Sequence, residues 1–111
     1  MLLITDQFHM IDLKVVDAEI PTRKLSPETV TLEVTPLTDP EHFLKEVLAG
    51  GVKVVTSVFS ARTSARFTAE LNYEVPYFQT PVLLAAGDSI LLGYTNSCHN
   101  PFTTWILVRV K

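Results

Sequence analysis

The 111-residue sequence has little cysteine and no long hydrophobic run. Its single cysteine, Cys98, has no partner for an internal disulfide and no companion for a zinc site, which predicts a protein of a reducing cytosol. No apolar stretch approaches the roughly 20 residues that span a bilayer. The first ten residues have neither a basic leader nor a long apolar region. We therefore expect a cytoplasmic protein with no membrane partner and no signal peptide.

Positive charge is also scarce, because 9 lysines and arginines face 12 aspartates and glutamates, giving a net charge of −3. This balance excludes the broad basic surface that holds duplex DNA through many phosphates. It does not exclude a small basic pocket that binds one anion, because the net charge is a sum over the whole chain and not the charge at one cleft. Hydrophobic residues make up 47% of the chain, enough for a packed core rather than disorder.

Several catalytic and cofactor-binding motifs are missing. The sequence contains no P-loop, no dinucleotide fingerprint and no nucleophile elbow. Its three histidines, His9, His42 and His99, have no short ligand spacing, so no metal site is predicted. We expect no cofactor.

Periodicity and turn signals predict a single α+β domain over residues 1–111, with a mixed β-sheet flanked by two helices. The expected order is three strands, a helix, a strand, a second helix and three further strands. The strands are expected within 1–5, 10–20, 29–37, 52–59, 80–94 (two strands joined at the turn "AAGD") and 103–110, and the helices after 38 and after 60.

The segment 29–37 alternates, which predicts a half-buried strand with Val30, Leu32 and Val34 facing the core. In the helix that follows, Thr38 is the expected N-cap and Glu41 is expected to complete a capping box.

The second helix is expected to begin after the N-cap Ser60. A shared buried face is predicted for Ala61, Ala65, Ala69 and Leu71, with Phe67 packed against Leu71.

The start of this second helix is the first candidate site. Its free N–H groups, together with Ser60, Arg62, Thr63 and Ser64, could bind a phosphate, because helix N-termini attract anions and arginine binds phosphate in bidentate fashion. The alternative is that Arg62 and Arg66 are simply solvated.

The second candidate is a pair of loop histidines. His9 follows the first strand, and His99 lies in a polar loop after a later strand. Paired imidazoles can act as general base and general acid in RNA phosphodiester cleavage. The alternative is that the two histidines are unrelated, and His42 is expected on the surface of the first helix.

Five segments resemble, in order and spacing, motifs of a small archaeal-virus and phage protein family. This family is typified by a turreted icosahedral virus protein of Sulfolobus and includes the type III anti-CRISPR ring nucleases. The segments are "LLITDQFHM" (2–10), "TVTLEVTPLTDPEHFLKEVLAGG" (29–51), "SVFSARTSA" (57–65), "AELNYEVP" (69–76) and "LLAAGDSILL" (83–92), the last resembling a Gly-Asp hairpin.

The resemblance implies a homodimer that binds cyclic tetra-adenylate across its interface and so counters host type III CRISPR-type defence in the host cytoplasm. The family's catalytic residues are not matched by type: its histidine falls at Ala61, its arginine near Cys98, its glutamate near Pro101 and its turn serine at His9. Two hypotheses follow. Either the pocket binds the ring without cutting it, or a metal-independent catalytic site is rebuilt from His9 and His99.

A different class of function is a protein-binding inhibitor of a host defence or regulatory protein. It would use an exposed apolar strand and the connection at 21–28, and it would need no nucleotide ligand.

Overall fold

The computed structural model describes residues 1–6, 13–16, 32–77, 82–94 and 103–111. The elements follow the expected order and confirm an α+β fold. They are β1 (Leu2–Thr5), β2 (Leu13–Val16), β3 (Leu32–Leu37), α1 (Pro40–Ala49), β4 (Val54–Ser57), α2 (Ala61–Leu71), β5 (Val82–Ala85), β6 (Ser89–Tyr94) and β7 (Thr104–Val110).

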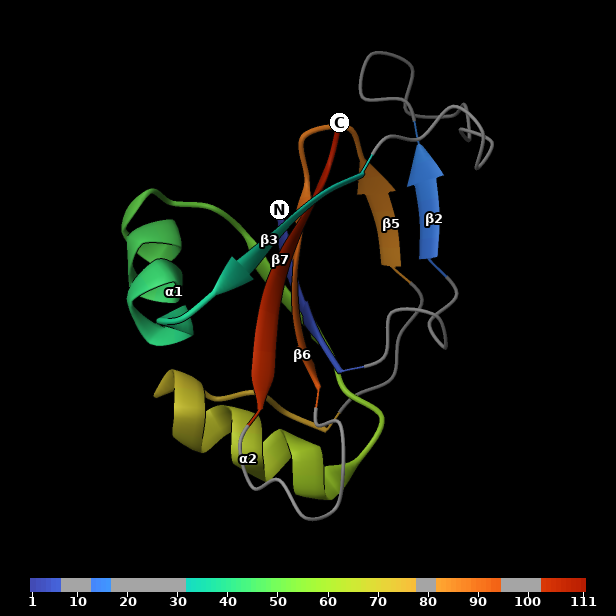
Figure 1. Ribbon diagram of the computed structural model, residues 1–111. Helices are drawn as coiled ribbons and strands as arrows, with labels where there is room; N and C mark the ends of the chain where they lie inside the picture. The colour runs from blue at the N-terminus through green and yellow to red at the C-terminus, as the bar shows by residue number, and fades with distance from the viewer. Residues whose placement is uncertain (7–12, 17–31, 78–81, 95–102) are drawn as a thin grey trace.

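Five strands form a mixed sheet in the order β3-β7-β6-β1-β4, and β2 pairs with β5 in a separate two-stranded sheet. The central strand β1 runs parallel to both β4 and β6, whereas β7 is antiparallel to β6 and β3. The carboxyl ends of β1, β4 and β6 therefore meet at one edge of the sheet, the lower edge in Figure 1, where α2 lies.

An apolar cluster is buried on each face of the large sheet. On one face, Leu44 of α1 and Phe67 of α2 pack with Trp105 and Leu91 of the sheet. On the other face, Leu84 of β5 packs with a second apolar cluster that includes Ile90 and Val108. The helices and the two-stranded sheet thus cover opposite faces of the five-stranded sheet (Figure 1).

The helix-side cluster centres on two aromatic rings. The ring centroids of Phe67 and Trp105 lie 4.6 Å apart, with the planes tilted by 49°. Gly93 of β6 lies beneath both rings, since a Cβ atom there would stand 2.7 Å from Phe67 Cζ and 2.7 Å from Trp105 Cζ3. Phe67 and Leu71, which were predicted to pack together, are both buried in this cluster.

The half-buried pattern expected for β3 is wrong. Leu32 is 42% exposed and Val34 59% exposed, while Val30 lies outside the described residues. The alternation predicts a strand correctly, but β3 is an edge strand, and no described segment covers its apolar face. Its Pro36 is also typical of an edge strand, because proline cannot donate to a ladder.

Two details of the helices also differ from expectation. The N-cap of α1 is Asp39, whose Oδ1 accepts the His42 N–H at 3.0 Å, rather than Thr38. Asp39 stands directly before Pro40 at the first helical position, so its carboxylate reaches the free N–H groups.

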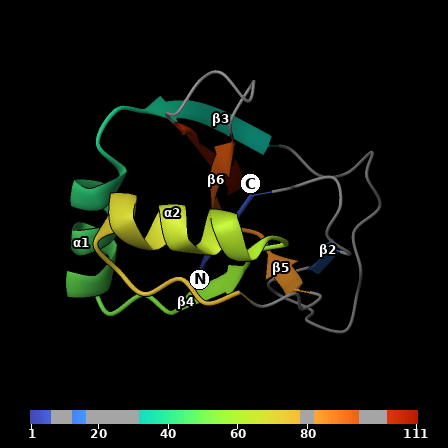
Figure 2. The ribbon, with the colours of Figure 1, turned by 90° about the horizontal axis from the view of Figure 1, so that it is seen from below.

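On α2, the three alanines expected in the buried face are exposed, because the helix presents Phe67 and Leu71 to the sheet and turns the alanine row to solvent. Figure 2 shows α2 from this end of the sheet, with α1 beside it.

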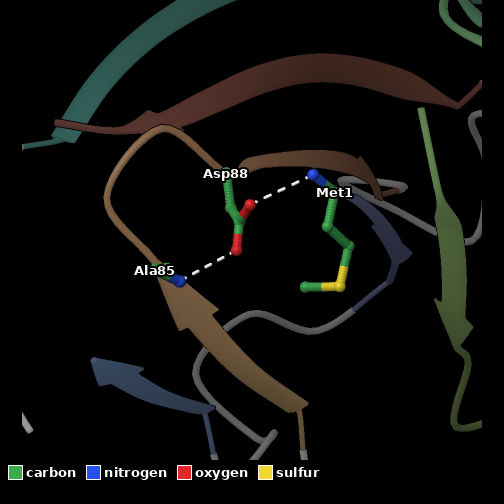
Figure 3. Close-up of polar contacts among 3 residues, drawn as sticks. All are labelled: Met1, Ala85 and Asp88. Carbon is green, nitrogen blue, oxygen red and sulfur yellow. Dashed lines mark hydrogen bonds and ion pairs between the residues drawn. The ribbon is translucent and has the colours of Figure 1, made fainter. Parts of the chain in front are cut away.

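The turn expected at "AAGD" is confirmed between β5 and β6, but the hairpin implied by the resemblance is not, because the two strands belong to different sheets. Asp88 fixes this turn: its Oδ2 accepts the Ala85 N–H at 2.8 Å and its Oδ1 lies 3.1 Å from the Met1 ammonium (Figure 3). The Gly87 N–H donates to the Val110 carbonyl, which ties the turn to the end of β7.

Candidate functional site

The candidate site lies at the edge where the three parallel strands end. Thr5 of β1 stands opposite Ser57 of β4 on one side and Leu92 of β6 on the other. In sheets with parallel strands, ligands bind beyond the carboxyl ends of the strands, where the following loops and helix N-termini converge. Of the elements here, α2 is the helix that begins at this edge, directly after β4 (Figure 1).

Ser60 is the N-cap of α2, as predicted. Its backbone is extended, with φ −138° and ψ 134°, and its Oγ accepts the Thr63 N–H at 3.4 Å. The Ser60 carbonyl accepts the Ser64 N–H at 2.9 Å. Within the described segments, the N–H groups of Ala61 and Arg62 have no hydrogen-bond acceptor, as is usual for the first turn of a helix.

The hydroxyl groups of Ser64 and Thr68 on α2 serve the structure of the domain. The Ser64 hydroxyl donates to the carbonyl of Val75, and the hydroxyl of Thr68 donates to the Ser64 carbonyl at 2.9 Å. Thr68 Oγ1 also accepts the Val75 N–H at 3.0 Å. Ser64 therefore anchors the segment after α2 onto the helix, and an anion at the N-terminus would rely on backbone N–H groups and on Arg62.

Arg62 is exposed in the first turn of α2, which has no acidic residue. Among the described residues it forms no ion pair, and the same holds for Arg66, which is half-buried one turn further on. Cations near a helix N-terminus are mildly unfavourable. The exposed guanidinium of Arg62 is thus available to a ligand at this edge.

Asp6 is a site residue that the sequence reasoning missed. It follows β1 directly, and its Oδ1 accepts the backbone N–H of Phe59, after β4, at 3.2 Å. Burial raises the pKa of the Asp6 carboxyl, although the Phe59 hydrogen bond acts in the opposite direction. The sequence shows Asp6 as an acidic residue at the end of an apolar strand. Only the parallel pairing of β1 with β4 brings Asp6 close to the start of α2.

His9 and His99 lie outside the described residues, as do Cys98 and Pro101. The described strands before the two histidines, β1 and β6, both end at the candidate edge. His42 is on the surface of α1, as expected, and its Nε2 lies 3.1 Å from Glu46 Oε1.

The described segments contain no cluster of histidine, cysteine or acidic side chains that could hold a metal ion. Neither of the two described helices has the length and hydrophobicity needed to cross a membrane.

The fold and the edge together define an α+β domain with a mixed sheet and a helix N-terminus at the ends of three parallel strands. Its structure is similar to that of B116 of Sulfolobus turreted icosahedral virus, with a TM-score of 0.63 over 97% of both chains. The two sequences are 14% identical, so the likeness shows a shared fold. No protein-family model matches the sequence, and no curated protein matches it significantly.

Proposed function

We propose that this chain is a viral or mobile-element protein that binds a cyclic oligonucleotide, of the cyclic tetra-adenylate type, at the interface of a homodimer. It acts in the host cytoplasm by sequestering or slowly cleaving this messenger and so counters type III CRISPR-type defence. One observation carries the proposal: α2 begins just after the carboxyl end of β4, which lies in register with those of β1 and β6, and its first turn carries the N–H groups of Ala61 and Arg62 and an exposed Arg62 side chain. The fold shared with a viral protein supports it.

A phosphate of the ring is the group best suited to this edge. It would accept the N–H groups of Ala61 and Arg62 and a bidentate contact from the Arg62 guanidinium. The Ser60 and Thr63 side chains line the same turn, with Ser60 holding the cap. A ring with two-fold symmetry suits a two-fold dimer, because each subunit presents the same groups to equivalent phosphates.

If the ring is cleaved, His9 and His99 are our candidate catalytic residues. One imidazole would take the proton of a ribose 2′-hydroxyl, which attacks the adjacent phosphorus, and the other would protonate the departing 5′-oxygen. The products would be a 2′,3′-cyclic phosphate and a 5′-hydroxyl, with no metal ion required.

Calorimetric titration with cyclic tetra-adenylate tests the ligand. We expect saturable binding at micromolar concentrations with one ring per two chains, and Arg62→Ala should weaken it at least tenfold. Arg66→Ala is the matched control, since it removes the same charge one turn further along the same helix. Absence of binding to the native protein would refute the proposed ligand.

Product analysis in the presence of a chelator then separates binding from cleavage. Cleavage that is lost in His9→Ala or His99→Ala, while binding is retained, would support the rebuilt site. Intact rings after prolonged incubation would support sequestration, and unchanged cleavage in both variants would exclude the two histidines as catalysts.

The exposed apolar side chains of β3 favour a second candidate, a protein-binding inhibitor with no nucleotide ligand. Leu32 and Val34 lie on an edge strand, which can pair with a strand of another protein. The connection at 21–28, expected to take part, lies outside the described residues. A stoichiometric host protein that is captured by the native chain and lost with Val34→Lys, but kept with Arg62→Ala, would favour this candidate.

A further inference from the structure

A pocket lies away from the α2 edge, between α1 and the helix-side face of the sheet. Its volume is about 330 Å³. Leu2 and Leu107 of the sheet line it together with Phe43 and Val47 of α1, and Val52 lines it from the segment after α1. The pocket is half open to solvent, and its volume lies at the lower end of the range found for small-molecule sites.

Arg109 brings a positive charge to this apolar lining, and Ser89 adds a hydroxyl. Glu33 of β3 stands opposite Arg109 in the strand register. It forms an ion pair with Lys111, whose Nζ lies 2.7 Å from Glu33 Oε2. Across the described part of the chain, Arg109 itself forms no ion pair. The exposed guanidinium thus remains available to an anion whose apolar part fills the pocket.

We propose that this pocket binds an aliphatic carboxylate, with its chain between α1 and the sheet and its carboxylate on Arg109. Burial of the hydrocarbon chain supplies most of the affinity, because each methylene removed from water adds to it. The guanidinium selects the charged head group and fixes its orientation. This site does not depend on the proposed nucleotide function, since it shares no residue with the α2 edge.

Decanoate, used below its micelle concentration, is the probe, with decanol as its neutral counterpart. Titrations followed by amide NMR shifts should show saturable binding of decanoate, with shifts at Leu107 and Val47. Arg109→Gln should weaken decanoate about two- to fivefold and leave decanol unchanged, as expected for one solvent-accessible ion pair.

Charge variants at the pocket opening provide a matched test that keeps the core intact. Val52 is 41% exposed and lines the pocket, whereas Leu48 is 40% exposed and does not. Val52→Lys should tighten decanoate binding and Val52→Glu should weaken it, while Leu48→Lys and Leu48→Glu leave it unchanged. The proposal is overturned if decanoate does not bind, if decanol and decanoate respond alike to Arg109→Gln, or if the variants at both positions behave alike.

Discussion

Asp6 Oδ1 accepts the backbone N–H of Phe59 at 3.2 Å, and this contact links the end of β1 to the turn that leads from β4 into α2. The two residues are far apart in sequence, and the parallel pairing of β1 with β4 brings them together. The contact places a carboxylate on Phe59, the residue directly before the N-cap of α2. An anion bound at the start of α2 would therefore lie at the same end of the sheet as the Asp6 carboxylate.

This relationship predicts a specific pH dependence of stability. Burial raises the pKa of Asp6 in the folded protein, so the folded state holds this proton more tightly than the unfolded state, whose pKa is about 3.9. The contribution of Asp6 to stability therefore falls as the pH rises through its folded pKa. Asp6→Asn keeps an oxygen acceptor for Phe59 and removes the charge. The free energy of unfolding of Asp6→Asn, taken relative to that of the native protein, should be higher at pH 7 than at pH 3. Urea unfolding at both pH values measures this difference.

Asp6→Ala is the control for the acceptor, since it removes the Asp6 oxygen that accepts the Phe59 N–H and should destabilise the fold at both pH values. A relative loss of stability by Asp6→Asn on going from pH 3 to pH 7 would contradict the assignment.

A second prediction concerns Glu33 on β3. The hydrogen bond from Lys111 is the largest cause that lowers the pKa of Glu33, and the charge of Arg109 contributes less. In a carboxyl NMR titration, Glu33 should titrate below its ordinary range. Lys111→Gln should move its pKa up more than Arg109→Gln does, and the reverse order would show that the cross-strand arginine dominates.

Gly93 provides a stability test of the aromatic packing. Gly93→Ala would bring a Cβ within 2.7 Å of both Phe67 and Trp105, so the rings must shift. We expect a loss of about 1–3 kcal/mol in the free energy of unfolding, the usual cost of overpacking a core. Gly50→Ala is the control, because its Cβ would have ordinary contacts at 3.5 Å and beyond. Equal effects of the two substitutions in denaturant unfolding would refute close packing over Gly93.

Asp88 is predicted to stabilise the junction of β1, β5 and β6. Asp88→Ala removes the acceptor of the Ala85 N–H and the partner of the Met1 ammonium. A loss of about 1–3 kcal/mol is expected, since a buried or half-buried donor is left without its acceptor. Asp88→Asn keeps an oxygen for Ala85 and should lose less. Thermal unfolding of the two variants distinguishes these effects, and an equal loss would assign the stabilisation to the ion pair.

The sequence by itself determined the order of the elements and several of their ends. Alternating and periodic apolar residues and the cap at Ser60 act locally, so their effects can be predicted from neighbouring residues. The same local signals placed Ser60, Arg62, Thr63 and Ser64 at a helix start.

Only the tertiary structure decided which faces are buried and which residues meet. The alternation of β3 predicted a half-buried strand, but its place at the sheet edge leaves Val34 exposed. The turn at Gly87 was recognised from the sequence, but the strand before it, β5, pairs with β2 rather than with β6. Asp6 joined the candidate site through parallel pairing with a distant strand. Strand partners are chosen by contacts between segments far apart in the chain, and no local pattern contains that information.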